Sequence, residues 1–196
     1  IERAKDLKEE KSQSFSVSAD MYHRFGAFQT NLLIEGFYTR LTDVFVLGKP
    51  YDRGDGILVK TRSNGPGAKV MGLTLEGKVA YLSILQIQAG LTLQRSRYDE
   101  PHKWHDDAPA EKKIFRTPDT YGYFTATCTP IKPLSIALSG TYTGRMLVQR
   151  MDITAENAEL GKMPERKAEA IRTPRFFDLG VKLAYDFKLY KTVDLQ

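Results

Sequence analysis

The stretch Leu85-Gln86-Ile87-Gln88-Ala89-Gly90-Leu91-Thr92-Leu93-Gln94 alternates apolar and polar residues without a break. Successive side chains of a β-strand point to opposite faces, so this stretch has one apolar face and one polar face. The same alternation recurs in six further stretches, and the links between them are short and long by turns. The pattern predicts an all-β, antiparallel up-and-down meander, and it is typical of strands that cross a membrane in a β-barrel.

We expect seven strands, with an eighth beginning near Val193, at these ranges: 14–24, 28–47, 57–81, 84–98, 114–129, 134–150 and 174–189. Short turns then follow the odd-numbered strands and long loops follow the even-numbered ones. The segment Asn64–Gly67 has the composition of a hairpin turn. We interpret it as a bulge or kink, because a hairpin there would scramble this order. A short capped helix is expected at 154–160.

The alternation would also suit a soluble barrel whose apolar face points inward. The lengths of three apolar stretches favour the membrane, because a tilted strand needs about 9–11 residues to cross a bilayer. Aromatic residues stand just before the expected short turns, where interfacial girdles occur. Cations on the apolar face of the fourth strand come only after its apolar stretch ends. These features are the stretches Leu85–Leu93, Met71–Tyr81 and Phe177–Phe187, the rings of Tyr81 and Phe187, and the cations Arg95 and Arg97.

Composition narrows the function classes. The 196 residues carry a net charge of +5 and are 41% hydrophobic. No apolar run approaches the roughly 20 residues of a membrane-spanning helix. The cations are spread out rather than clustered, which argues against a nucleic-acid partner. The single cysteine, Cys128, excludes an intramolecular disulfide and fits a small packed apolar side chain.

The ends of the chain lack an initiator methionine and a signal peptide, and Val193–Gln196 reads as the start of a strand. We therefore expect residues 1–196 to be a single partial β-barrel domain taken from a larger protein. A sheet that is not closed leaves strand edges open, so we also expect the piece by itself to associate through those edges.

Several segments, in order along nearly the whole chain, resemble the TonB-dependent receptors of the bacterial outer membrane, especially those of Bacteroidetes. The start of the first strand is similar to the "LKPEKS" entry of that family, the second strand to "FYTRIKD" and the third to "KARVYGLELEG". Three later segments also fit the family in order. The segments are Leu7–Asp20, Glu35–Asp43, Ala68–Gly77, Arg116–Tyr123, Leu138–Gly144 and Phe177–Leu183.

The resemblance implies a 22-stranded transmembrane barrel filled by an N-terminal plug, with this chain in its C-terminal half. It implies energised uptake of a scarce nutrient, namely an iron chelate, haem, a corrinoid or a glycan. The partners implied are the TonB complex, the plug and outer-membrane lipid. The chain lacks the plug, the TonB-contacting motif, the early strands and the final strands of that pattern, and Gly65-Pro66-Gly67 departs from it.

The segment His102-Lys103-Trp104-His105-Asp106-Asp107 is the strongest candidate for chemistry. An aromatic ring among charges in an outer loop suits ligand binding by His102, Trp104 and His105, although a solvated loop explains the same residues. We predict no metal and no cofactor. His23 lies near Asp20 without an activated nucleophile, so we predict that the chain is not an enzyme.

The expected inward charges should pair with one another or with the plug. They are Glu76, Lys78, Asp178, Lys182, Asp186 and Lys188. Two other function classes remain open at this point: a soluble β-barrel that binds a small apolar ligand, and a passive outer-membrane channel or barrel enzyme.

Overall fold

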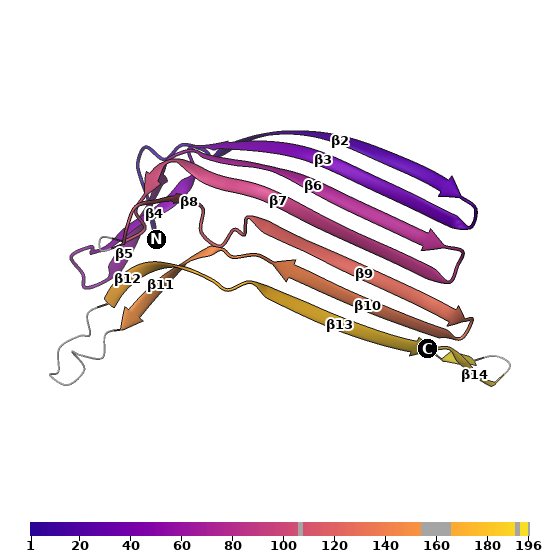
Figure 1. Cartoon of the computed structure of the whole chain (residues 1–196). Helices are drawn as coiled ribbons and strands as arrows, with labels where there is room; N and C mark the ends of the chain where they lie inside the picture. The colour runs from indigo at the N-terminus through magenta and orange to yellow at the C-terminus, as the bar shows by residue number, and fades with distance from the viewer. Residues whose placement is uncertain (106–107, 154–165, 191–192, 196) are drawn as a thin grey trace.

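The computed structural model describes residues 1–105, 108–153, 166–190 and 193–195, and within these ranges it has strands and turns but no helix. Seven long strands lie side by side in chain order in one curved layer (Figure 1). Every neighbouring pair is antiparallel, which confirms the predicted meander. These strands are β2 (Lys11–Phe25), β3 (Phe28–Thr42), β6 (Ala68–Tyr81), β7 (Leu85–His102), β9 (Thr120–Ile131), β10 (Leu134–Thr143) and β13 (Phe176–Tyr185).

Shorter strands extend the meander beyond the main sheet. The strand β8 (Glu111–Lys113) pairs with β7. A three-stranded sheet has the order β1 (Glu2–Arg3), β5 (Leu58–Asn64) and β4 (Phe45–Asp52). Two further hairpins pair β11 (Leu147–Ile153) with β12 (Arg166–Arg172), and β14 (Phe187–Tyr190) with β15 (Val193–Leu195). All of these except β14 and β15 lie at the end of the main sheet opposite its short turns (Figure 1).

The short turns lie together at one end of the sheet (Figure 1). Only Gly26 and Ala27 separate β2 from β3, and Gly26 has a φ of +58°, which glycine adopts without steric cost. Residues 82–84 join β6 to β7, and residues 132–133 join β9 to β10. The predicted order of short turns is therefore confirmed for these three. The fourth, expected at Tyr190-Lys191, reaches beyond the described residues.

The segment Asn64–Gly67 is a corner between two sheets. The strand β5 pairs with β4 and β1 rather than with β6, so it is not a hairpin turn, and the predicted continuous strand 57–81 was wrong. The side chain of Asn64 donates to the carbonyls of Asp43 (2.7 Å) and Lys8 (2.9 Å). A Cβ on Gly67 would lie 2.9 Å from the carbonyl oxygen of Leu41. Because the segments of Gly67 and Leu41 approach so closely, this corner requires glycine at position 67.

Other strand boundaries also differ from the sequence prediction. The second strand ends at Thr42 rather than residue 47, because Asp43 has a φ of +55°. The expected loops at 48–56, 99–113 and 151–173 contain parts of β4, β7, β8, β11 and β12. The fifth strand begins at Thr120 rather than 114, after Arg116 (φ +57°) and Pro118. The sixth and seventh are interrupted at 144–146 and at Asp186. The helix expected at 154–160 lies outside the described residues.

The two faces of the sheet differ in exposure, and the polar face is the more crowded one. On β7, Leu91 and Leu93 are 42% and 47% exposed, whereas Thr92 and Ser96 on the opposite face are 6% and 1% exposed. A water-soluble sheet places its apolar face on the core and its polar face in solvent. Here the polar side chains lie inward and the apolar side chains lie outward, as in a membrane barrel.

The outward apolar band ends in aromatic rows. At the short-turn end, Phe25, Phe28 and Tyr81 lie in register on three strands, with ring centroids 5.5 Å and 4.8 Å apart. At the other end, Phe15 and Tyr38 are in register. Each strand makes about ten steps of ~3.4 Å between these rows, or roughly 24 Å across a membrane at a tilt of about 45°. That height matches the apolar band of about 25 Å expected of a barrel.

In the part of the chain that the structure describes, no second layer covers either face of the main sheet to make a hydrophobic core. Within the described ranges, five apolar residues are buried: Val59, Ala68, Ala108, Leu147 and Ala168. The described strands do not close on themselves either, since β2 and β13 are the two ends of the sheet order. The structure therefore does not form the small closed barrel around an apolar interior that was the soluble alternative.

Candidate functional site

The polar face carries a set of side-chain hydrogen bonds that link neighbouring strands. The hydroxyl oxygens of Thr74 and Thr92 lie 3.0 Å apart, from directly paired positions on β6 and β7. Next to them, Gln88 donates from Nε2 to the hydroxyl of Tyr123 on β9 (2.9 Å). The ring of Tyr123 covers Gly90, where a Cβ would lie 2.5 Å from it. These contacts fix the polar side chains into a crowded, hydrogen-bonded surface.

Charged side chains on the polar face are sorted by height. Asp20, Glu76 and Asp178 occupy one row across the sheet. The register runs without a break through Asp20, Leu33, Glu76, Gly90, Tyr123, Thr141 and Asp178. Lys78 and Lys182 lie nearer the short turns. Among the described residues, the predicted inward charges Glu76, Lys78, Asp178 and Lys182 form no salt bridge with one another. The interpretation that they pair among themselves is therefore not supported.

The predicted ligand-binding residues are half-buried rather than solvated. Tyr98 and His102 pack with ring centroids 5.6 Å apart, near the end of β7. Trp104 lies between His105 (5.8 Å) and Phe115 (6.3 Å, edge-on). The structure thus brings Trp104 and His105 together, while His102 packs on a different ring. Asp106 and Asp107, which completed the motif in the sequence, lie outside the described residues.

Two polar side-chain atoms at this end of the sheet, the indole Nε1 of Trp104 and the hydroxyl of Ser96, are buried and have no hydrogen-bond partner among the residues that the structure describes. Burial also raises the pKa of the Tyr98 phenol. The described residues contain no group of three or more His, Cys, Asp or Glu side chains placed to hold a metal ion. Over the same residues, no helix is long and apolar enough to cross a membrane.

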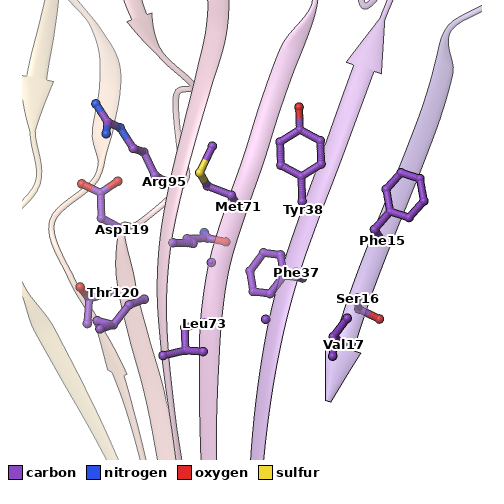
Figure 2. A pocket seen from close by; sticks show the side chains of 14 residues that line it. Phe15, Ser16, Val17, Phe37, Tyr38, Met71, Leu73, Arg95, Asp119 and Thr120 are labelled. Carbon is purple, nitrogen blue, oxygen red and sulfur yellow. The ribbon is translucent and has the colours of Figure 1, made fainter. Parts of the chain in front are cut away.

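The outward face has a hollow beside Gly36, which the sequence alone did not indicate. Gly36 on β3 lacks a side chain, and a Cβ placed there would meet no atom within 4 Å. Val17, Leu73 and Leu93 are in register with Gly36. Phe15, Tyr38, Met71, Arg95 and Asp119 form the upper rim (Figure 2). The hollow has a volume of about 850 Å³ and is shallow and wide open. Only the pairing register, which places a glycine beside these apolar rows, reveals it.

An ion pair lies above this rim, between Lys69 and Asp99 at 2.7 Å. The hydrogen bond from Lys69 holds the pKa of the Asp99 carboxyl below its usual range, with a smaller contribution from the charges of Lys69, Arg40 and Lys112. Both groups of the pair are partly exposed, so the pair contributes little to stability.

Comparison with known proteins finds similarity in structure but not in sequence. No protein-family model matches the chain, and no curated protein matches it. Solved structures do match it, and three of them each align with nearly all of this chain. The ferric-catecholate import receptor Fiu of E. coli K12 matches with a TM-score of 0.60 and 15% identity, over 97% of this chain and 23% of that chain. The copper transporter OprC matches with a TM-score of 0.58 and 13% identity, over 97% of this chain and 25% of that chain. The FrpB iron transporter of Neisseria meningitidis matches with a TM-score of 0.56 and 15% identity, over 95% of this chain and 26% of that chain.

This chain spans about a quarter of the length of those structures. At such low identity the likeness establishes the fold alone. The chain is therefore an all-β antiparallel meander with the fold of part of those structures, which confirms the predicted fold class.

Proposed function

We propose that this chain forms part of the barrel wall of a TonB-dependent outer-membrane receptor, in the C-terminal half of a 22-stranded barrel of the Bacteroidetes type. The single observation that carries the proposal is the inverted exposure of the sheet, with Leu91 and Leu93 outward and Thr92 and Ser96 inward. The likeness to import receptors and metal transporters supports it.

The activity proposed for the whole protein is energised uptake of a scarce nutrient, namely an iron chelate, haem, a corrinoid or a glycan. The wall supplies the crowded polar surface past which the nutrient moves. The plug domain and the TonB complex are the partners proposed for the full-length protein. In this reading the inward charges Glu76, Asp178, Lys78 and Lys182 meet the plug, since they lack partners within the described wall. Like the structural neighbours, which are import proteins, it performs no enzymatic reaction.

Uptake by cells tests this proposal. Cells that express the full-length protein should accumulate one of three labelled probes: a ferric catecholate, haem or cobalamin. Deletion of the gene for TonB should abolish that accumulation, because the transport step is energised. Accumulation that persists without TonB would instead identify a passive channel. A full-length protein that stays monomeric and folded without detergent would contradict any barrel role.

We further propose that His102, Trp104 and His105 contribute to ligand binding at the outer end of the barrel. The unpartnered Nε1 of Trp104 supports a hydrogen bond to a ligand acceptor. Trp104→Phe keeps an aromatic ring but removes this donor. Loss of a hydrogen bond to an uncharged acceptor should weaken uptake affinity by roughly three- to tenfold. Unchanged affinity in this variant would assign the tryptophan to loop packing against Phe115.

The proposed lateral neighbours of this wall are further strands of the same barrel, which would cover the edges at β2 and β13. The chain by itself should therefore associate through these edges. Sedimentation of the isolated 196 residues in detergent should give dimers or larger species. A stable monomer at micromolar concentration would contradict this expectation.

A further inference from the structure

A row of cations crosses three adjacent strands of the outward face, just above the apolar band. Arg40 on β3 pairs directly with Lys69 on β6, and Lys69 pairs directly with Arg97 on β7. Neighbouring strands lie about 4.8 Å apart, so these like charges are close, and like charges directly opposite each other destabilise a sheet. A fourth cation, Arg95, lies in the rim of the Gly36 hollow, two residues below Arg97.

The acids nearby do not neutralise this row. Among the described residues, the acid that forms a salt bridge with this row is Asp99, and it pairs with Lys69. Arg40 and Arg97 are exposed and form no salt bridge with any described residue. The next cation in register, Lys113 on β8, already has its own partner in Asp119. The row therefore holds an excess of positive charge that an external anion would stabilise.

The hollow beside Gly36 lies directly below this row. Arg40, Lys69 and Arg97 each stand two residues from the rim residues Tyr38, Met71 and Arg95, which is about 7 Å along a strand. Figure 2 shows Arg95 near the level of Met71 and Tyr38, with the carboxylate of Asp119 on its other side, and with Leu73 of β6 and Val17 of β2 lower. A molecule with an anionic head and an apolar tail matches this arrangement of charge above and hydrocarbon below.

We propose that the cation row and the Gly36 hollow together bind a phosphate-bearing lipid, with its phosphate on Arg40 and Arg97 and an acyl chain beside Gly36. Arginine binds phosphate through two parallel hydrogen bonds, which makes it well suited to a lipid head group. The inference rests on the proposed function, because it requires the apolar face to meet lipid. A second copy of the chain is a poorer occupant, since its own cation row would face like charge.

Native mass spectrometry of the full-length protein in detergent tests this site, with diphosphorylated lipid A as the probe. The double variant Arg40→Gln/Arg97→Gln should bind the probe roughly tenfold or more weakly, because each charge-assisted hydrogen bond contributes strongly. The matched control is Arg24→Gln/Lys132→Gln, which removes the same charge from exposed positions at the short-turn end of the sheet and should leave binding unchanged. Equal weakening by both pairs would overturn the proposal, because it would show a general effect of net charge.

The hollow is tested separately by filling it. Gly36→Leu should weaken binding of lipid A, whereas Gly77→Leu should not, although a Cβ at either glycine meets open space on the same face. Dephosphorylated lipid A should bind weakly. If it bound as well as the diphosphorylated lipid, or if inorganic phosphate at equal concentration displaced the lipid, the proposed lipid site would be wrong. A detergent-dependent protein that fails only these tests would keep its proposed role in transport.

Discussion

The main sheet below the corner at Asn64 and the small sheet above it differ in how apolar side chains are distributed between their faces. Below the corner, Leu91 is 42% exposed and its neighbour Thr92 is 6% exposed. Above it, apolar side chains lie on both faces of β5, since Leu58 is 71% exposed and its neighbour Val59 is 8% exposed. The main sheet sorts apolar and polar side chains onto separate faces, whereas the small sheet does not. The corner is the point where this sorting ends.

The largest expected effect comes from a charge placed on the outward face at mid-height. Leu91→Arg should reduce the free energy of unfolding in lipid vesicles by about 2–4 kcal/mol, because the cation would lie in hydrocarbon. The matched variant Gln86→Arg places the same charge on the inward face at an exposed position and should change stability little. Denaturant titration of the refolded full-length protein measures both. A larger loss in the inward variant would reverse the assignment of the faces.

A smaller effect compares two glycines of β6 that lie on opposite faces. A Cβ on Gly72 would lie 2.5 Å from the ring of Phe37 and 2.6 Å from the carbonyl oxygen of Leu93, whereas Gly77 has open space. Gly72→Ala should therefore cost about 1–3 kcal/mol of unfolding free energy. Gly77→Ala, measured in the same denaturant titration, should be close to neutral. Similar losses in the two variants would mean that the inward face is not the crowded one.

The corner itself should be weakened without affecting the barrel below it. Asn64→Ala removes the hydrogen bonds to Lys8 and Asp43, and should cost about 1–2 kcal/mol locally. Hydrogen exchange should then become roughly tenfold faster in β4 and β5 and stay unchanged in β7. Ser63→Ala is the control on the same strand. Equal acceleration in β7 would show that the two regions unfold together.

The smallest effect is a pH dependence near the corner. The pKa of Asp99 is held below its ordinary value of 3.8, mainly by the hydrogen bond from Lys69. Its contribution to stability is therefore present above about pH 4 and is lost as the pH falls through the lowered pKa. Lys69→Gln should make the loss of stability between pH 4 and pH 2 slightly shallower. An identical acid dependence in the two proteins would show that this pair has no measurable role.

Sequence reasoning predicted the strands and their faces because both depend on a period of two, which is visible in any single strand. The period of two separated the apolar face of Leu85–Leu93 from its polar face, but by itself it left open which of the two points outward. The breaks at Asp43, Arg116 and Asp186 were missed, because each depends on a local φ or on a contact with a part of the chain that is distant in sequence. The cation row was also invisible, since Arg40, Lys69 and Arg97 are far apart in sequence and only the register aligns them. The half-burial of Trp104 depended in the same way on Phe115.

The stacked rings of Phe25, Phe28 and Tyr81 have a consequence for how the protein sits in its surroundings. Because the three rings belong to neighbouring strands in register, they can only rise or sink as a group. Moving all three from the polar–apolar boundary into water or deep hydrocarbon would be unfavourable three times over. The row therefore fixes the position of this wall relative to the polar–apolar boundary, and neighbouring molecules must adjust to that position.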